Sequence, residues 1–151
     1  MNVEDLRGRI LVDTNVLIYA TLKADPRNDQ ALRVLEQRHR REVEMYVSVQ
    51  NLAEMYPNLT GPKNQPSDSP TIARDKILSI SRLRGLTILP LTFDGVHDAL
   101  DLCVRGNVTR QSYFDRQLVS LMLREKIPLI VTENTKDFMS MDGIAPINPF
   151  A

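Results

Sequence analysis

The sequence predicts an α/β fold in which a parallel β-sheet lies between layers of helices. Two observations lead to this expectation. Short apolar runs that fit strands alternate along the chain with longer segments in which apolar residues recur at helical spacing. One of these runs, residues 127–132, is apolar almost throughout, which is typical of a strand buried on both faces of a parallel sheet. Such strands are normally joined by right-handed helical crossovers.

The first half of the chain is expected to supply two strands and three helices. Residues 9–12 form a strand-like run, and the apolar residues after it recur at helical spacing. An amphipathic helix is expected from residue 29 to about residue 43, followed by a strand at residues 45–49. The third helix should begin near Asn51 and stop before Pro57, because the residue before a proline is disfavoured in helical conformation.

The second half begins with a long loop. Residues 57–70 contain four prolines and one glycine among polar residues, which predicts a surface loop that is functional or mobile rather than a linker. The elements expected after it are a helix at 72–83, a strand at 86–91, a helix that runs through residue 104 and breaks at Gly106, a helix at 112–126, a strand at 127–132 and a last short strand ending near residue 147.

Length and composition indicate one domain. A chain of 151 residues can bury about 70% of the surface that it exposes when unfolded, so residues 1–151 are expected to form a single domain. The one cysteine, Cys103, excludes an intramolecular disulfide, and its place on an apolar helical stripe predicts that it is buried. The first ten residues lack the apolar core of a signal peptide, and no apolar run is long enough to span a membrane. We therefore expect a cytoplasmic protein with no membrane partner.

Charge does not by itself indicate a nucleic-acid partner. Nineteen basic residues balance nineteen acidic ones, so any contact with nucleic acid must be local. The densest basic run is Arg38, His39, Arg40 and Arg41, at the end of an expected helix, where cations also complement the helix dipole. A solvated helix end is favoured over phosphate binding for this run, and phosphate binding is kept as a hypothesis.

Four acidic residues form the main candidate site. Each lies where a strand-like run gives way to a helix or in the first turns of a helix: Asp13, Glu54, Asp115 and Asp137. In a parallel sheet such positions gather at the carboxyl ends of the strands. Carboxylates crowded together resist ionisation unless a cation joins them, and Mg²⁺ prefers hard oxygen ligands. The set therefore predicts a site for Mg²⁺ or Mn²⁺.

Each acid also has a simpler explanation as a helix cap. Three pairs show the spacing of a capping box, in which the acid bonds back to the first residue of the helix: Asn51 with Glu54, Ser112 with Asp115, and Asn134 with Asp137. Asp13 fits a simple N-cap. For each of the three capping-box acids taken singly, capping is the preferred interpretation, whereas for Asp13 the two interpretations are left open. Only the set of four favours a metal site.

Other catalytic arrangements lack their sequence signals. His39 and His97 are assigned no role, because neither has a Cys or an acid at zinc-ligand spacing. No glycine-rich phosphate loop follows a strand, and no G-x-S-x-G nucleophile motif occurs. Cys103 has no plausible neighbouring base.

Four segments together resemble the PIN-domain ribonucleases, most closely the VapC-type toxins of toxin–antitoxin pairs. They are ILVDTNVLI at residues 10–18, SVQNLAEMY at 48–56, SYFDRQLVSLML at 112–123 and PLIVTENTKDF at 128–138. The resemblance covers nearly the whole chain and implies a three-layer α/β/α sandwich with a central five-stranded parallel sheet. It also implies Mg²⁺- or Mn²⁺-dependent hydrolysis of single-stranded RNA, a small antitoxin protein as partner, and a homodimer. The proline-rich loop after Tyr56 departs from the compact family pattern.

The resemblance assigns roles to particular residues. Asp13, Glu54, Asp115 and Asp137 look like the acidic quartet of the family, with Asp13, Asp115 and Asp137 as metal ligands. The polar residues that would orient the ligands are Asn15, Thr132 and Asn134, although capping also explains the two asparagines. Basic residues that could contact RNA are Arg110, Arg116, Arg38, Arg40 and Arg41.

The sequence thus predicts a metal-dependent endoribonuclease, the toxin of a toxin–antitoxin pair. One alternative is a non-catalytic RNA- or protein-binding module of the same fold, whose acids only cap helices. A second is a metal-dependent phosphatase that uses its first aspartate as nucleophile. Haloacid-dehalogenase-like enzymes of that kind need a second aspartate two positions on, where this chain has Asn15.

Overall fold

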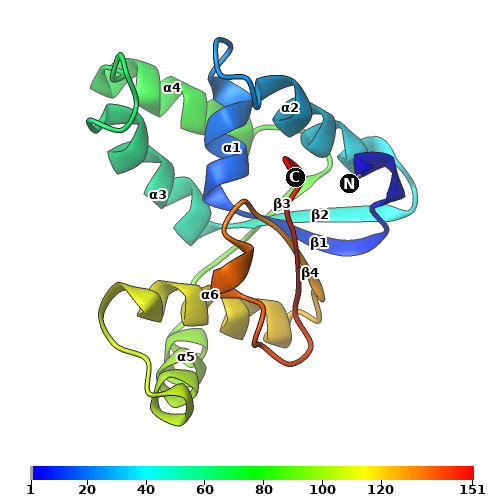
Figure 1. Ribbon diagram of the computed structural model, residues 1–151, viewed down its shortest axis with the longest axis vertical. Coiled ribbons are helices and arrows are strands. Elements are labelled where there is room, and N and C mark those ends of the chain that lie inside the picture. The colour runs from blue at the N-terminus through cyan, green and yellow to red at the C-terminus, as the bar shows by residue number, and fades with distance from the viewer. Residues whose placement is uncertain (1) are drawn as a thin grey trace.

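A computed structural model describes residues 2–151 and shows five parallel strands in one sheet (Figure 1). The order across the sheet is β3-β2-β1-β4-β5. The strands are β1 (Gly8–Val12), β2 (Val43–Ser48), β3 (Leu86–Leu89), β4 (Leu129–Val131) and β5 (Ala145–Ile147). The predicted five-stranded parallel α/β fold is confirmed.

Helices cover both faces of the sheet (Figure 1). One face carries α1 (Thr14–Thr21), α2 (Asn28–Glu36), α3 (Val49–Thr60) and α4 (Pro70–Ser81). The other face carries α5 (Phe93–Gly106) and α6 (Tyr113–Arg124). Short 3₁₀ turns lie at η1 (Val3–Asp5), η2 (Gln37–His39), η3 (Arg110–Ser112) and η4 (Thr135–Asp137).

Alternation along the strands builds two hydrophobic cores. In β1, Ile10 and Val12 belong to the core under the first helical layer, whereas Leu11 belongs to the core under α6. Met45 and Tyr46 of β2 divide between the two cores in the same way. Since successive side chains of a strand point to opposite faces, two cores follow from strands that are apolar on both faces.

The strand order reverses between β1 and β4. From β1 the chain builds outward through β2 to β3, then returns with β4 on the other side of β1. In the register of these two central strands Val12 lies opposite Val131. A crevice forms outside the carboxyl ends of the strands at such a switch point, and this is where α/β proteins bind ligands. Asp13 and Thr132 are the next residues after these two strands.

Several predicted boundaries are wrong. Helix α3 does not stop before Pro57 but continues through it to Thr60, and it begins at Val49 rather than near Asn51. The helix expected to reach about residue 43 ends as α2 at Glu36, is followed by the turn η2, and Val43 already begins β2. The expected loop is therefore shortened to residues 61–69.

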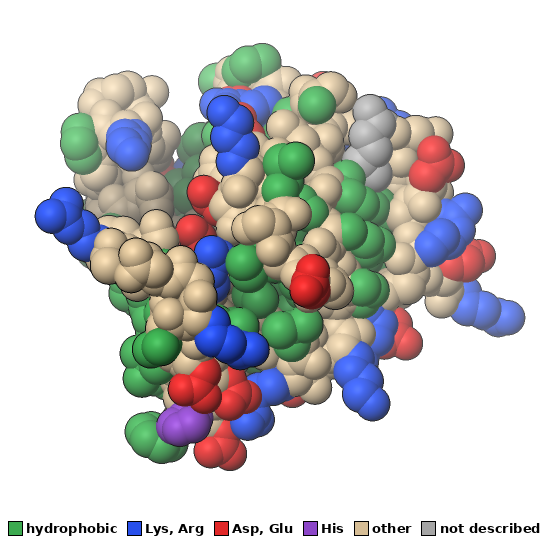
Figure 2. Space-filling view, turned by 60° about the horizontal axis from the view of Figure 1, so that its bottom comes forward, with side chains coloured by type: hydrophobic (Ala, Val, Ile, Leu, Met, Phe, Trp, Pro, Cys, Tyr) green, Lys and Arg blue, Asp and Glu red, His purple; other side chains and the backbone are tan. Residues whose placement is uncertain are grey.

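Helix α5 is less buried than its apolar stripe predicts. Ala99 is its buried residue, Cys103 is half-buried rather than buried, and Phe93 and Val104 are 80% and 81% exposed. Figure 2, which brings this side of the molecule forward, shows hydrophobic side chains on its surface beside a group of acidic ones. None of the helices within residues 2–151 is long and apolar enough to cross a membrane.

Candidate metal centre

Asp13 is the most deeply placed carboxylate of the crevice. Its side chain is 7% exposed, and its backbone N–H donates to the carbonyl of Val131, which ties the end of β1 to β4. The hydroxyl of Thr132 donates to Oδ2 at 2.7 Å, and the backbone N–H of Thr14 donates to Oδ1 at 2.8 Å. The second bond makes Asp13 the N-cap of α1, as predicted. Capping and site geometry therefore coexist in this residue.

Two amide side chains complete the surroundings of Asp13. Nδ2 of Asn15 lies 3.4 Å from Oδ2 of Asp13 and 3.2 Å from the hydroxyl oxygen of Thr132. Nδ2 of Asn51 lies 3.2 Å from Oδ1 of Asp13. Asn15 is itself held by the backbone N–H of Glu133, which donates to its Oδ1 at 3.1 Å. The carboxylate is thus fixed by donors from three different segments of the chain.

Glu54 reaches the same crevice from the second turn of α3. The hydroxyl of Thr14 donates to Oε2 of Glu54 at 3.2 Å, while the backbone of Thr14 holds Asp13, so one residue links the two acids. Nε2 of Gln50, one turn earlier on α3, donates to Oε1 of Glu54 at 2.8 Å. These bonds orient Glu54 toward Asp13.

A polar network joins α3 to α6 beside Asp115. Nε2 of Gln50 also donates to the carbonyl of Phe114 at 3.1 Å, and Nε2 of Gln117 donates to Oε1 of Gln50 at 2.6 Å. The hydroxyl of Tyr113 in turn donates to Gln117. This network fixes the first turn of α6, which carries Asp115.

Asp137 lies on the turn η4 and is exposed. Its segment is attached to the crevice through Asn134, whose backbone N–H donates to the Thr132 hydroxyl oxygen at 3.0 Å. The side chain of Asn134 makes no capping bond, so the alternative of a helix cap is not formed, and its role in orienting metal ligands stays a prediction. Thr132 thus connects Asp13 with the segment that carries Asp137.

The pKa shifts show that the four acids share one electrostatic environment. Burial raises the pKa of Asp13, hydrogen bonds from Thr132 and Thr14 oppose the rise, and the charges of Glu54 and Asp137 add to it. Burial raises the pKa of Asp115 to about 6, with further contributions from Asp137, Asp13 and Glu54. Charge interactions of this kind act between nearby groups, so Asp13 and Asp115 lie near the other two acids at this end of the sheet.

The donor set fits a hard divalent cation. Within residues 2–151, none of the four carboxylates has a Lys or Arg nitrogen within 4.0 Å, so their negative charge lacks a direct ion-pair partner. The candidate ligands are all oxygens, as Mg²⁺ and Mn²⁺ prefer. The acids do not approach one another closely enough for all to coordinate one ion directly, which suits Mg²⁺ because it retains several waters.

The capping boxes predicted for three of the acids are not formed. The capping box of α3 pairs Ser48 with Asn51, which leaves Glu54 free to face the crevice. Ser112 makes no side-chain cap bond, because the turn η3 runs directly into α6 and leaves Ser112 in helical conformation. Asn134 makes none either. The simpler explanation therefore fails for Glu54, Asp115 and Asp137.

The candidate RNA contacts divide into two groups. Arg116 lies near Asp115 and lowers its pKa, and Arg110 lies on the turn that leads into the same helix. The basic run precedes β2 and so lies at the opposite, amino-terminal edge of the sheet. There Arg38 binds the carbonyls of Leu35 and Arg84, and Arg40 binds the carbonyl of Glu4. The structure does not bring Arg38, Arg40 or Arg41 to the carboxylates.

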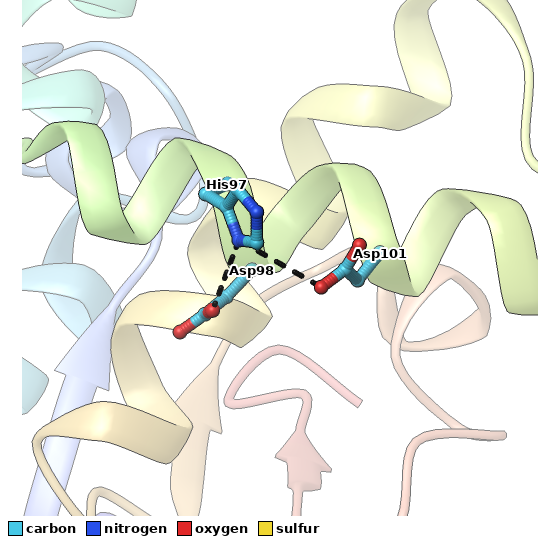
Figure 3. A group of neighbouring side chains, drawn as sticks. All are labelled: His97, Asp98 and Asp101. Carbon is cyan, nitrogen blue, oxygen red and sulfur yellow. Dashed lines mark ion pairs between the residues drawn. The ribbon is translucent and has the colours of Figure 1, made fainter.

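A separate group of possible ligands lies on the surface of α5 (Figure 3). His97 was expected to have no acid at ligand spacing, which is wrong: its Nδ1 lies 3.8 Å from Asp98 and 3.7 Å from Asp101. In the described chain this is the group of metal-ligating side chains whose ligand atoms all lie within 4.8 Å of one another. Asp98 is also bonded to Arg124 at 2.7 Å, so the group is a surface ion-pair network.

Sequence reasoning missed several polar residues of the site. Thr14, Gln50 and Gln117 were not considered, and Asn51 was considered only as a cap. Asn51 and Gln117 are buried, and buried amides need partners, but burial of single polar residues cannot be read from one sequence.

The fold and the crevice together define an α/β protein with an acidic site at the switch point of its sheet. Comparison with known protein families identifies the family. The PIN domain family matches residues 10–144, so the chain belongs to the PIN domain family. A search of curated proteins found no match.

Solved structures with the same fold are toxins and toxin–antitoxin complexes. VapC20 of Mycobacterium tuberculosis, a sarcin–ricin loop cleaving toxin, has a TM-score of 0.66 and 18% identity, covering 87% of this chain and 94% of its own. VapBC2 of Rickettsia felis, bound to a promoter DNA fragment, has a TM-score of 0.65 and 19% identity, covering 93% and 98%. VapBC-1 of nontypeable Haemophilus influenzae has a TM-score of 0.63 and 15% identity, covering 95% and 100%. At these identities the likeness concerns the fold.

Proposed function

We propose that this protein is a divalent-metal-dependent endoribonuclease that hydrolyses single-stranded RNA and acts as the toxin of a toxin–antitoxin pair. The observation that carries the proposal is the group of four carboxylates without an ion-pair partner at the switch point of a PIN-domain sheet. Asp13, Asp115 and Asp137 would hold Mg²⁺ or Mn²⁺, and Glu54 would complete the site directly or through water. A bound cation of this kind lowers the pKa of an attacking water and stabilises charge on the phosphate.

The surrounding residues keep the ligands in position. Thr132 and the backbone of Thr14 hold Asp13 by short bonds, so these two contacts fix the carboxylate. The amides of Asn15 and Asn51 are more distant, at 3.4 and 3.2 Å, and add weaker contacts to the two oxygens of Asp13. Polar groups of this kind fix the orientation of ligands and raise metal affinity.

The resemblance to PIN-domain ribonucleases implies that water attacks the phosphorus and the bond to the 3′-oxygen breaks, so cleavage should leave a 3′-hydroxyl and a 5′-phosphate. Arg110 and Arg116 are proposed to contact RNA phosphates beside Asp115. The phosphatase alternative is disfavoured, since both oxygens of Asp13 accept hydrogen bonds and Asn15 acts as an amide donor where a second aspartate would be needed.

The decisive experiment compares RNA cleavage by wild type, Asp13→Asn and Asp5→Asn in Mg²⁺ and in EDTA. Wild type should cleave in Mg²⁺ only, and Asp13→Asn should be at least about 100-fold slower, since even residues that only orient metal ligands are worth about 10–100-fold. Asp5 is an exposed acid on η1, before β1, so Asp5→Asn should match wild type. Equal cleavage in EDTA would refute the metal mechanism, and RNA binding without cleavage would favour the non-catalytic module.

We also propose a small antitoxin partner, because several solved structures of the same fold are toxin–antitoxin complexes. A homodimer is proposed because the family resemblance implies one. The large exposed hydrophobic side chains of α5 and the zero net charge are compatible with self-association. Light scattering should give about twice the chain mass of 17.2 kDa for the purified protein. A mass of one chain at high concentration would reject the dimer.

A further inference from the structure

A groove of about 830 Å³ opens beside the carboxylates. One wall is the end of α1 with the connection to α2, and the other is the end of α3, the loop at residues 61–69 and α4. In Figure 1 the α1–α2 connection lies at the top of the view above α1, and the α3–α4 connection lies at the upper left, at the ends of α3 and α4. Asn15 lines the groove, and its Nδ2 lies 3.4 Å from Oδ2 of Asp13. Asn15 is thus shared by the groove and the surroundings of Asp13, while none of the four carboxylates lines the groove itself.

Four cations line this groove, and two of them are neutralised. Arg27 pairs with Asp25 and with Glu133, each at 2.9 Å. Lys76 pairs with Asp68 at 2.8 Å. These ion pairs also neutralise Asp25 and Asp68 of the groove walls, so they leave little free charge of either sign.

Lys23 and Lys63 are the remaining cations. Lys23 lies on the α1–α2 connection and Lys63 on the loop at residues 61–69, so they belong to opposite walls. Both are exposed, and neither has an ion-pair partner among residues 2–151. The groove thus presents two free positive charges, and Asn15 connects it to the surroundings of Asp13.

The remaining polar side chains offer hydrogen-bond acceptors. Nδ2 of Asn64 donates to the carbonyl of Leu59 at 2.8 Å, and Nε2 of Gln65 donates to the carbonyl of Pro62 at 2.7 Å. Each of these amides therefore keeps its side-chain carbonyl oxygen and one N–H for a ligand. Nucleic-acid bases carry both amino donors and carbonyl or ring-nitrogen acceptors, so they can bond to both groups.

We propose that this groove binds the single-stranded RNA on one side of the scissile phosphate, with Lys23 and Lys63 each contacting a backbone phosphate from opposite walls. The proposal rests on the proposed ribonuclease function and adds the path of the substrate. The eight residues of α1 span about 12 Å, which separates these contacts from the reacting phosphate. The lysines should therefore bind the substrate without taking part in the reaction.

The test removes both charges with Lys23→Gln/Lys63→Gln. Binding of a fluorescein-labelled single-stranded RNA is measured by anisotropy in EDTA over a range of KCl concentrations. A phosphate contact on a single strand contributes about 0.7 to the slope of log K against log salt. Loss of two contacts should reduce the slope by about 1.4 and raise Kd about 25-fold at about 0.1 M salt. In Mg²⁺, KM for the same RNA should rise while kcat stays within about 2-fold.

The matched control is Arg82→Gln/Lys126→Gln. These exposed cations also lack an ion-pair partner within the described residues, and both lie on connections that lead to the amino ends of strands, away from the carboxylates. The control changes the net charge equally and should alter Kd less than about 2-fold. The proposal that RNA binds in the groove would be overturned if both double variants raised Kd for RNA equally, or if Lys23→Gln/Lys63→Gln left Kd unchanged.

Two further outcomes separate this proposal from others. If a labelled Glu-rich peptide loses binding in Lys23→Gln/Lys63→Gln while RNA does not, the groove holds an acidic protein segment and the RNA path is rejected. Binding in EDTA does not require cleavage, so lysine-dependent binding without cleavage in Mg²⁺ supports the groove and rejects the ribonuclease. If the protein cleaves RNA but Lys23→Gln/Lys63→Gln binds RNA as wild type does, the proposed RNA path through the groove is rejected and the ribonuclease function stands.

Discussion

At the scale of single residues, the side chain of Asn51 joins a helix cap to the candidate metal centre. Its Oδ1 accepts the backbone N–H of Ser48 at 3.0 Å, which closes the capping box of α3, and its Nδ2 points to Asp13. Because the side chain is fully buried and bonded at both ends, it has one orientation. The start of α3 and the position of Asp13 are therefore coupled through one amide.

Asp115 allows the metal centre to be distinguished from a helix cap by the sign of a stability change. Asp115→Asn keeps the shape of the side chain and removes a charge that burial and neighbouring acids oppose. In EDTA at neutral pH we expect the variant to be more stable by about 1 kcal/mol, after allowance for its partial exposure to solvent. This corresponds to a rise in Tm of about 2–4 °C. Mg²⁺ should raise the Tm of wild type by mass action and that of the variant less.

The control for this measurement is Asp29→Asn. Asp29 also lies in the first turn of a helix, but it is exposed and faces no cluster of acids. Its loss should lower stability by about 0.3–1 kcal/mol through the helix dipole. If Asp115→Asn in EDTA behaves like Asp29→Asn, and wild type does not respond to Mg²⁺, then Asp115 serves only the helix.

At the scale of elements, the sequence predicted strands better than helix ends. Each strand is apolar on the face or faces that it buries, and this pattern is local, so the strand positions follow directly. Helix ends depend on contacts with distant segments. Helix α3 continues through Pro57 because Met55 and Leu59, on either side of the proline, are fully buried. Burial of such side chains offsets the cost of a proline, about 3 kcal/mol.

The same distinction applies to the candidate site. The positions of Asp13, Glu54, Asp115 and Asp137 could be expected from sequence, because strand ends of a parallel sheet gather at one edge. The partners that hold them could not, since Gln50 and Gln117 meet across 67 positions of the chain. The basic run was misleading for a related reason: the strand direction, which sends Arg38 to the opposite edge, matters more than the density of charge.

At the scale of the whole molecule, the acids divide into two classes with opposite effects on stability. Ion pairs with Arg27, Arg33 and Arg124 lower the pKa values of Asp25, Glu4 and Asp98. Burial and mutual repulsion raise the pKa values of Asp13 and Asp115. Acids of the first class stabilise the fold when they are ionised, whereas those of the second class stabilise it when they are protonated.

This division predicts how stability varies with pH when no metal is bound. The pKa of Asp115 is about 6 in the folded protein, against an ordinary value of 3.8, so between these values the folded chain binds more protons than the unfolded chain. In EDTA, Tm should therefore fall as pH rises from about 4.5 through about 6. Below about 4 it should fall again, because the ion-paired acids become protonated. Thermal melts at a series of pH values measure both decreases in Tm. In Asp115→Asn the decrease between about pH 4.5 and pH 6 should be smaller than in wild type.

Bound metal should counteract the fall in Tm that is expected as pH rises through about 6. Divalent cations bind the ionised carboxylates and compete with protons, so the stabilisation by Mg²⁺ should grow as pH rises through about 6. The difference in Tm between Mg²⁺ and EDTA should be small near pH 5 and larger near pH 7.5. A metal bound by the exposed acids of α5 would not compete with the proton that Asp115 holds, so it would give no increase in this difference through pH 6. A difference independent of pH over this window would thus place the metal outside the crevice, since the raised pKa values belong to Asp13 and Asp115.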